Sequence, residues 1–379
     1  MTTHYLDNAA TTKPCRAAVE AMMRCLSEHY GNPSSLHRAG LEAQKELDYA
    51  KAIIASALNC DTREIIFTSC ATESTNMALK STAAAYGRRR KKIVTSAVEH
   101  ASVKKTLAFL SENDGFEIVE VKPDETGKYK SIDFLNACDD NTVMISMMMV
   151  NNETGHVLPV KEVLNMVKRK FPHIITHCDA VQAFMKYSVN ASSLCADFIS
   201  ISGHKVHAAK GIGVLYVKKG SKIRPLILGG KQEMGLRAGT ESVPLIAGFG
   251  AAVEALSADI DKRFEYVKSL NISLREKLEQ LESVRILSPI DASPYIISII
   301  IPKIRSEIML HYLEAKGIYV SSGSACSKGA GSGVPEIFGA TSEEADSIIR
   351  ISFSCENTMD DINALADAIA SGQRDIMHR

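Results

Sequence analysis

The chain has 379 residues, of which 45% are hydrophobic and 23% are charged. This composition is typical of a folded globular protein and excludes collagen-like, disordered and disulfide-scaffold chains. The 44 basic residues balance the 44 acidic ones, so net charge gives no general attraction to nucleic acid or membranes, and a small-molecule substrate is favoured. At this length we expect two domains.

No segment approaches the roughly 20 consecutive apolar residues that a membrane span needs. Residues 1–10 contain Asp7 and do not resemble a signal sequence, so we expect a cytoplasmic protein. The nine cysteines include no Cys-x-x-Cys pair and do not resemble a disulfide framework or a zinc cluster. We expect eight of them to be free, buried thiols.

Apolar runs in the first two-thirds of the chain predict seven strands, at residues 64–68, 92–96, 117–121, 143–150, 174–177, 198–201 and 213–217. Amphipathic segments of helical length separate most of them, for example at 72–86, 101–113 and 160–170. This alternation predicts an α/β fold with a mostly parallel seven-stranded sheet covered by helices. Ligand sites in such sheets collect at the carboxyl ends of the strands.

The pattern changes after a long charged, amphipathic stretch at about 253–282. A strand at 293–301, a helix through 316, a strand at 350–353 and a final helix predict a smaller α+β domain. We place the large domain at 15–257 and the small domain at 1–14 and 258–379. The basic run 87–92 is interpreted as a solvated loop, with direct nucleic-acid contact as the less favoured alternative.

Lys205 comes after an apolar strand that passes into small residues. A lysine at a strand end can be partly desolvated, which lowers its pKa and makes its amine a nucleophile for Schiff-base chemistry. Asp179 ends a neighbouring strand, and Gln182 follows three residues later. A lysine and an aspartate that pairs with a ring nitrogen are the minimum apparatus for pyridoxal phosphate. A surface lysine and a helix-capping aspartate are the alternatives.

The segment 67–74 passes from a strand through a short polar loop into a helix, where free backbone amides and the positive helix end favour a phosphate. Helix capping by Ser69 or Thr72 is the alternative. We reject a zinc site built from His173, His177 and Cys178, because a strand would hold the two histidines too far apart. We therefore expect no metal.

Cys326 lies in the small-residue loop 321–333, beside Lys328. We expect this loop to be exposed and mobile, and a nearby cation favours the thiolate form of a cysteine. A flexible linker with an incidental cysteine explains the loop equally well. Arg350 begins the strand 350–353 and could bind a substrate carboxylate through its guanidinium group or form a surface salt bridge.

In this order, these segments resemble the cysteine desulfurases, which belong to the class V, fold type I pyridoxal-phosphate enzymes. The resemblance spans nearly the whole chain. It rests on the ordered set 5–12 (YLDNAATT), 31–37 (GNPSSLH), 68–74 (TSCATES), 99–100 (EH), 150–153 (VNNE), 179–182 (DAVQ), 202–205 (SGHK), 237–240 (RAGT) and 321–326 (SSGSAC). The last of these separates desulfurases from other class V enzymes and is similar to the long-loop group that delivers sulfur to protein partners.

The resemblance implies a role for each candidate residue. Lys205 would hold pyridoxal 5'-phosphate as a Schiff base, Asp179 would face the pyridine nitrogen, Gln182 would contact the ring hydroxyl and His100 would stack over the ring. Phosphate contacts would come from Ala71, Thr72, Ser202 and His204. Thr240 would complete the phosphate site of the other subunit, which implies an obligate homodimer. Asn152 and Arg350 would hold the substrate carboxylate.

The implied reaction converts L-cysteine to L-alanine and leaves a persulfide on Cys326, with Lys205 and His100 as candidates to move protons. The sulfur would pass to an acceptor protein, either an iron–sulfur scaffold or a tRNA sulfurtransferase. Selenocysteine lyase is one alternative, which the presence of Cys326 disfavours. A non-catalytic interaction subunit is another, which the intact set of Lys205, Asp179, His100 and Cys326 disfavours.

Two departures from the family pattern bear on the cofactor. The family commonly has glycine where this chain has Cys70, and Gly-Pro where it has Ala208-Ala209. A side chain at position 70 could crowd a loop whose backbone must approach the phosphate closely. We therefore state weakened cofactor affinity as a hypothesis.

Overall fold

Seven strands form the central sheet of the larger lobe, in the order β2-β8-β7-β6-β5-β3-β4. The computed structural model describes residues 3–322 and 333–377. The strands are β2 (Ile65–Thr68), β3 (Lys92–Ser96), β4 (Glu117–Val121), β5 (Thr142–Met148), β6 (Ile175–Asp179), β7 (Phe198–Ser202) and β8 (Gly213–Val217). β8 runs antiparallel to both of its neighbours, β2 and β7, and the other strand pairs of this sheet are parallel. This arrangement confirms the predicted α/β fold with a mostly parallel seven-stranded sheet.

The observed strand bounds differ from the predicted ones mainly at two central strands. β5 ends at Met148, two residues before the predicted end, and β6 continues to Asp179, two residues beyond it. The two strands pair in register, with Met148 opposite Asp179. The carboxyl end of β6 therefore carries Asp179 itself, at the edge where ligand sites of such sheets collect.

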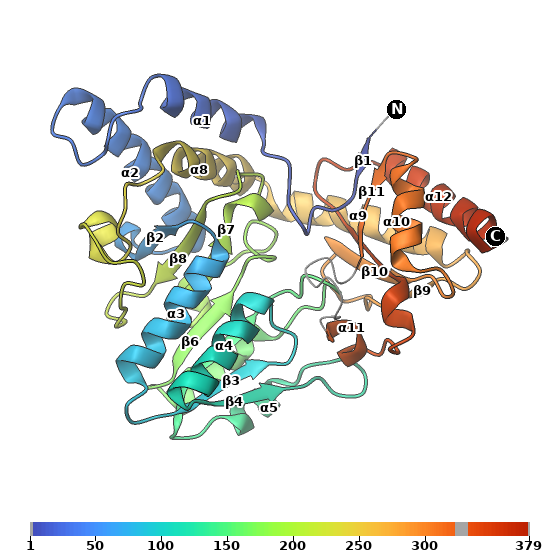
Figure 1. Ribbon diagram of the computed structural model, residues 1–379, viewed down its shortest axis with the longest axis horizontal. Coiled ribbons are helices and arrows are strands. Elements are labelled where there is room, and N and C mark those ends of the chain that lie inside the picture. The colour runs from blue at the N-terminus through green and yellow to red at the C-terminus, as the bar shows by residue number, and fades with distance from the viewer. Residues whose placement is uncertain (1–2, 323–332, 378–379) are drawn as a thin grey trace.

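Helices cover both faces of this sheet (Figure 1). On one face, α3 (Ala71–Tyr86) and α4 (Ala101–Asp114) bury apolar side chains against the strands. The other face packs against the remaining helices of this lobe. These are α1 (Arg16–Ser27), α2 (Arg38–Leu58), α5 (Ser131–Ala137), α6 (Val160–Lys170), α7 (Ala191–Leu194) and α8 (Val243–Ser257), with the short 3₁₀ turns η1 (Thr62–Glu64), η2 (Gly203–Lys205) and η3 (Gln232–Gly235) in the connections.

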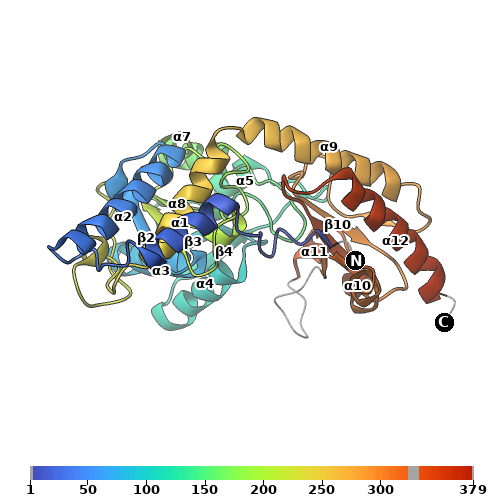
Figure 2. The ribbon, with the colours of Figure 1, turned by 90° about the horizontal axis from the view of Figure 1, so that it is seen from above.

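The smaller lobe contains a four-stranded antiparallel sheet in the order β12-β13-β10-β9. Its elements are α9 (Ile260–Leu278), β9 (Arg285–Ile286), β10 (Ile296–Ile300), α10 (Ser306–Glu314), β11 (Ile318–Tyr319), β12 (Ser321–Ser322), α11 (Val334–Ile337), η4 (Glu344–Ser347), β13 (Ile348–Ser352) and α12 (Met359–Met377). Helices α9, α10 and α12, which Figure 2 shows around β10, bury apolar side chains in one cluster with β10 and β13. The domain boundaries at 14/15 and 257/258 stay a prediction.

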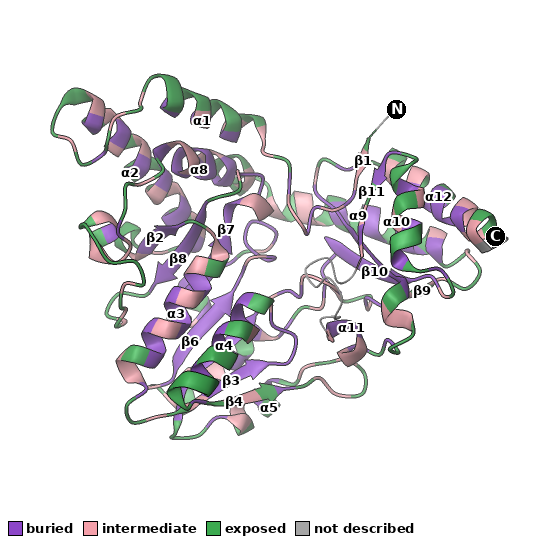
Figure 3. Cartoon of the chain, viewed as in Figure 1, coloured by how far each residue is buried: buried purple, intermediate pink, exposed green. Residues whose placement is uncertain are grey.

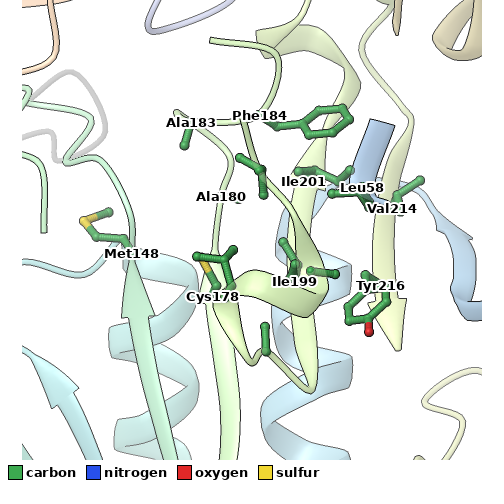
Figure 4. Packing of buried hydrophobic residues seen from close by; sticks show 14 of the residues in the cluster. Leu58, Met148, Cys178, Ala180, Ala183, Phe184, Ile199, Ile201, Val214 and Tyr216 are labelled. Atoms are coloured by element: carbon green, nitrogen blue, oxygen red, sulfur yellow. The ribbon is translucent and has the colours of Figure 1, made fainter. Parts of the chain in front are cut away.

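The central strands are buried along their whole length. Every residue of β5, β6, β7 and β8 is buried, as Figure 3 shows by colour. Covered parallel strands are apolar on both faces, so their sequences are apolar runs without strict alternation. In Figure 4 the side chains of Cys178, Ile199, Ile201, Val214 and Tyr216 gather in one such cluster from three adjacent strands.

The N-terminal segment connects the two lobes. Its first strand, β1 (His4–Tyr5), pairs with β11 of the smaller lobe. Further along, the backbone N–H of Thr12 donates to the carbonyl of His204 at 2.8 Å, and that of Cys15 donates to the carbonyl of His207 at 2.9 Å. The intervening residues therefore cross between the lobes beside the carboxyl end of β7, as the dark blue trace in Figure 1 shows.

The basic run 87–92 is engaged with its own lobe. Arg90 Nε donates to the Asp140 carbonyl at 2.9 Å, and Lys91 Nζ donates to the Asp114 carbonyl at 2.7 Å. Lys92 forms an ion pair with Asp139 at 3.0 Å. The interpretation of this run as a solvated loop stays a prediction.

Within the described ranges, no single helix is long and apolar enough to cross a membrane. Helices α8 and α9 reach that length and hydropathy only as a pair, and they are bent by 78° at their junction.

Candidate active site

Lys205 lies at the carboxyl end of β7, as predicted. The strand ends at Ser202, and the 3₁₀ turn η2 then carries the lysine. Its Nζ donates to the backbone carbonyls of Ala9 and Ala10, both at 2.6 Å. The amine is therefore held against the segment that crosses between the lobes, and it lies close to the smaller lobe.

Asp179 and Gln182 lie beside this lysine. Asp179 is buried at the end of β6, and its Oδ1 accepts the backbone N–H of Val181 at 3.0 Å. Burial raises the pKa of Asp179 above its ordinary value, while that hydrogen bond and the charges of His100 and Lys205 lower it. Gln182 Nε2 donates at 3.0 Å to the Ala9 carbonyl, which also accepts from Lys205. The structure thus brings together the lysine, the acid and the amide that the sequence predicts.

The candidate phosphate residues meet where β7, β8 and α3 come together. Ser202 pairs with Gly213 of β8. A Cβ on Gly213 would lie only 2.9 Å from the amide nitrogen of Ala71, so α3 begins directly against this strand. The first amides of a helix have no carbonyl partner within the helix, and the N-cap residue Cys70 makes no side-chain capping bond. Ala71 and Thr72 therefore present amides beside Ser202.

Ser202 itself carries an unpaired hydroxyl. Its Oγ is buried and has no hydrogen-bond partner among the described residues. Leaving such a group unpaired costs about 1–3 kcal/mol, so a buried orphan hydroxyl beside free helix amides points to a ligand with acceptor oxygens.

Two histidines complete this part of the site. His100 is the N-cap of α4, where its Nδ1 accepts the backbone N–H of Ser102 at 3.1 Å. His204 lies in η2, next to Lys205, and its Nδ1 is 3.3 Å from the Thr11 hydroxyl. Burial lowers the pKa of His204 to about 4, so this ring is neutral at pH 7 and can act as a hydrogen-bonding partner.

Arg350 enters the site from β13 of the smaller lobe and is buried. Its Nη2 donates to Asp7 Oδ1 at 2.9 Å, and its Nη1 donates to the backbone carbonyl of Asn152 at 3.0 Å. The Nε atom is buried and has no partner among the described residues. Asn152 and Arg350 thus lie together, and the Nε of the guanidinium group is left for an acceptor; their role in binding the substrate carboxylate stays a prediction.

Two candidate residues lie apart from this cluster. Thr240 is exposed, between η3 and α8. The segment that carries it is held near the start of α3, because Arg237 Nε forms an ion pair with Glu73 at 3.0 Å. Cys326 lies outside the described residues.

The fold and this geometry can be compared with known proteins. The family model for aminotransferase class-V matches residues 4–365. The chain belongs to the class-V aminotransferase family. It is 37% identical over 368 residues to the cysteine desulfurase IscS of Methanosarcina thermophila. The alignment covers 96% of this chain and 90% of that protein. This match confirms the resemblance to cysteine desulfurases.

Solved structures give the same result for this class-V aminotransferase. A NifS-like protein superposes with a TM-score of 0.92 at 35% identity, covering 98% of this chain and 99% of that one. A structure described as SspA in complex with cysteine has a TM-score of 0.79 at 30% identity, covering 94% of this chain and all of that one.

Membership of this family implies pyridoxal phosphate, and the site fits that group. The orphan Ser202 hydroxyl and the amides at the start of α3 suit a phosphate. The buried carboxyl of Asp179 suits a protonated ring nitrogen, and Lys205 lies within the same cluster. Within the described ranges, no group of three or more His, Cys, Asp or Glu side chains could hold a metal ion. The ring of His177 lies between the hydroxyls of Ser146 and Ser200.

The structure also adds site residues that were not assigned roles from the sequence. Asp7, Ala9 and Ala10 belong to the motif at 5–12, which indicated the family but not a function. Lys186 is buried and donates from Nζ to Gln182 Oε1 at 3.0 Å. Its spacing of four residues from Gln182 was the one available signal, because it lies in no predicted element.

The two departures from the family pattern do not strain the backbone. Cys70 has φ −175°, an extended conformation that any residue adopts, and Ala208 and Ala209 are not among the residues with positive φ. All eight described cysteines are free, but only three of them, Cys25, Cys138 and Cys178, are buried. The expectation that all eight are buried is therefore wrong, since the other five are half-buried at the ends of elements or in connections.

Proposed function

We propose that this protein is a pyridoxal-phosphate-dependent cysteine desulfurase that converts L-cysteine to L-alanine and a Cys326 persulfide. The observation that carries the proposal is the convergence of Lys205, Gln182 and Arg350 on the segment 7–10, in a class-V aminotransferase fold. The family resemblance to proteins named cysteine desulfurases and the cysteine complex of a related structure support L-cysteine as the substrate.

In this proposal each residue acts on a stated part of the reaction. The free Nε of Arg350 and the neighbouring Asn152 bind the substrate carboxylate. Bound pyridoxal phosphate supplies an electron sink for the charge that develops at the substrate Cα. Lys205 and His100 would move protons. Asp179 keeps the ring nitrogen protonated through its carboxylate.

The sulfur transfer is assigned to Cys326. Its thiolate attacks the substrate sulfur, the bond between Cβ and sulfur breaks, and the electron pair of that bond stays on the carbon fragment. Protonation of that fragment gives L-alanine, and Cys326 keeps the sulfur as a persulfide. Transfer of this sulfur to an iron–sulfur scaffold or a tRNA sulfurtransferase is part of the proposal, and the IscS name of relatives favours the first acceptor.

We also propose a homodimer and a cytoplasmic location. Apolar side chains are exposed on α1, in the connection to α2 and in the first turn of α2; they are Val19, Met23, Leu26, Tyr30, Leu36 and Leu41. Exposed apolar patches mark interaction surfaces, which supports a subunit contact. Thr240 would contact the cofactor phosphate of the other subunit.

The experiment that tests the function is the release of L-alanine from L-cysteine by the cofactor-loaded protein, with a thiol reductant present. We expect alanine from the wild type and almost none from Cys326→Ala, with cyanide-labile sulfur on the wild type only. Cys195→Ala is the matched control, because that half-buried thiol lies at the end of α7. Equal alanine from wild type and Cys326→Ala would contradict the role of Cys326 and favour a selenocysteine lyase. Absence of alanine from both would contradict the enzyme proposal.

A further inference from the structure

Lys186 is a buried lysine for which the reaction described above has no use. Its relative exposure is 7%, and its Nζ lies 5.4 Å from the centroid of the Tyr295 ring. Within the described part of the chain it has no carboxylate within ion-pair distance. Burying a cationic group without an opposite charge is costly, and burial with the charges of Lys205 and Arg350 lowers the pKa of Lys186 to about 7.

The contact that Lys186 makes is with the amide of Gln182. Nζ donates to Oε1 at 3.0 Å, and the other end of the same amide, Nε2, donates to the Ala9 carbonyl at 3.0 Å. An amide has one acceptor end and one donor end. Rotating it by half a turn would place Oε1 against the Ala9 carbonyl oxygen and the NH₂ group against the Lys186 amine. The two neighbours therefore select the same orientation.

The Gln182 amide is linked to Lys205 through a shared hydrogen-bond acceptor. The Ala9 carbonyl that accepts from Gln182 also accepts from Lys205 Nζ at 2.6 Å. The chain of contacts thus runs from Lys186 through Gln182 to the oxygen on which Lys205 rests. The donor end of the Gln182 amide therefore lies toward the Ala9 carbonyl that Lys205 also contacts, and its acceptor end lies toward Lys186.

We propose that Lys186 is a positioning residue that fixes the Gln182 amide with its NH₂ donor toward the cofactor. The inference rests on the proposed function, because it assumes that Gln182 contacts the cofactor ring. Lys186 does not touch the reacting atoms and acts only through Gln182. A small cavity of about 20 Å³ lies beside Lys186; its other lining residues include Lys205, His207, Arg263, Tyr295 and Cys355.

The first test compares cofactor binding in two variants of the full chain. Lys186→Met keeps the length of the side chain and removes the donor, whereas Lys186→Arg keeps a donor and can use the neighbouring cavity. We expect Lys186→Met to weaken pyridoxal-phosphate binding about fivefold, since one hydrogen bond contributes about 1 kcal/mol. Lys186→Arg should bind within twofold of the wild type. The readouts are the dissociation constant from fluorescence titration and the pH midpoint of the cofactor absorption band.

A second test separates positioning from a general loss of structure. Gln182→Leu removes the amide, so Lys186→Met should have no further effect on the dissociation constant in that background. Lys168→Met is the matched control, because Lys168 is a mostly buried lysine whose Nζ contacts Asp197 and the Ile174 carbonyl. It should lower the melting temperature and leave cofactor binding unchanged.

The inference is overturned if Lys186→Met binds the cofactor as the wild type does with the same pH midpoint, or if its effect adds fully to that of Gln182→Leu. None of these measurements requires turnover of L-cysteine. A wild type that binds the cofactor but releases no alanine therefore contradicts the proposed function. The titrations still decide the role of Lys186 in that case. A wild type that does not bind the cofactor contradicts both.

Discussion

Arg350 Nη2 lies 2.9 Å from Asp7 Oδ1, so a residue of β13 is tied to the segment that crosses between the lobes. The two residues are 343 positions apart in the chain. The same guanidinium group keeps a buried Nε without a partner among the described residues. Asp7 thus already neutralises the group proposed to bind the substrate carboxylate, and it should oppose the arrival of a second carboxylate.

Asp7→Asn should lower KM for L-cysteine. The amide oxygen can still accept from Arg350, while the negative charge that repels the substrate carboxylate is removed. We expect KM to fall a few-fold, kcat to change less than twofold, and stability to fall by about 1–3 kcal/mol because a buried charge loses its partner. Steady-state alanine production and thermal melting measure these effects. A rise in KM would show instead that Asp7 mainly holds Arg350 in place.

Ser202→Ala should weaken binding of the cofactor. A hydrogen bond from a hydroxyl to a charged phosphate contributes about 1.5–3 kcal/mol, which is about ten- to a hundredfold in the dissociation constant. The protein without cofactor should be no less stable, because the variant removes a buried hydroxyl that has no partner. Absorbance titration with pyridoxal phosphate and melting of the cofactor-free protein provide the two readouts.

Ser200→Ala is the control for this prediction. Ser200 lies two residues earlier on β7, where its hydroxyl contacts His177 and Thr75. We expect this variant to lose stability and to keep its affinity for the cofactor. If the two serine variants bind the cofactor equally well, the phosphate site is not at Ser202.

The sequence predicts the strand ends well because their cause is local. The apolar residues of β8 stop at Val217, and the small residues after β7 lead directly to Lys205, so both the strand and the lysine can be located without tertiary information. Asp179, at the end of the apolar residues of β6, can be located from the sequence for the same reason. Ligand sites at carboxyl ends of parallel strands then bring these residues to one edge.

The contacts around them could not be predicted in this way. Two sets of contacts depend on how one lobe lies against the other. They are the ion pair of Asp7 with Arg350 and the hydrogen bonds from Lys205 Nζ to the carbonyls of Ala9 and Ala10. Backbone carbonyls carry no signature in the sequence. Lys186 was missed because a lysine outside a predicted element is exposed in most proteins, and only the packing of Tyr295 and Gln182 shows that it is buried.

Cys70→Gly should strengthen binding of the cofactor a few-fold. The backbone of Cys70 is extended, so it needs no glycine, and any effect on affinity comes from the side chain near the amides of Ala71 and Thr72. Glycine should also lower stability by about 0.5–1 kcal/mol through its backbone entropy. Titration with pyridoxal phosphate measures the affinity, with Cys60→Ala, in the connection between α2 and η1, as a control. An unchanged dissociation constant would remove the basis of the crowding hypothesis.

Glu99→Gln should change how stability depends on pH. Glu99 Oε1 accepts from Ser96 Oγ at 2.5 Å and from the backbone N–H of Met148 at 2.8 Å, whereas Oε2 is buried without a partner among the described residues. Met148 is the register partner of Asp179, so two buried carboxyl groups lie near the same strand end. Burial, with a smaller contribution from the charge of Asp179, raises the pKa of Glu99 to about 8.

The sign of the effect follows from proton binding. Between about pH 4.5 and 8 the folded protein keeps a proton on Glu99 that the unfolded chain has lost, so the contribution of Glu99 to stability falls as pH rises through this range. The fall is at most about 1.4 kcal/mol per pH unit. Glutamine is neutral at every pH and of nearly the same shape, so Glu99→Gln should gain stability relative to the wild type as pH rises from 5 to 8. Melting temperatures across this range test the prediction, with Glu20→Gln on the exposed face of α1 as the control. Parallel curves for Glu99→Gln and the wild type would mean that Glu99 is ionised in the folded protein, and a second buried negative charge would then face the site beside Asp179.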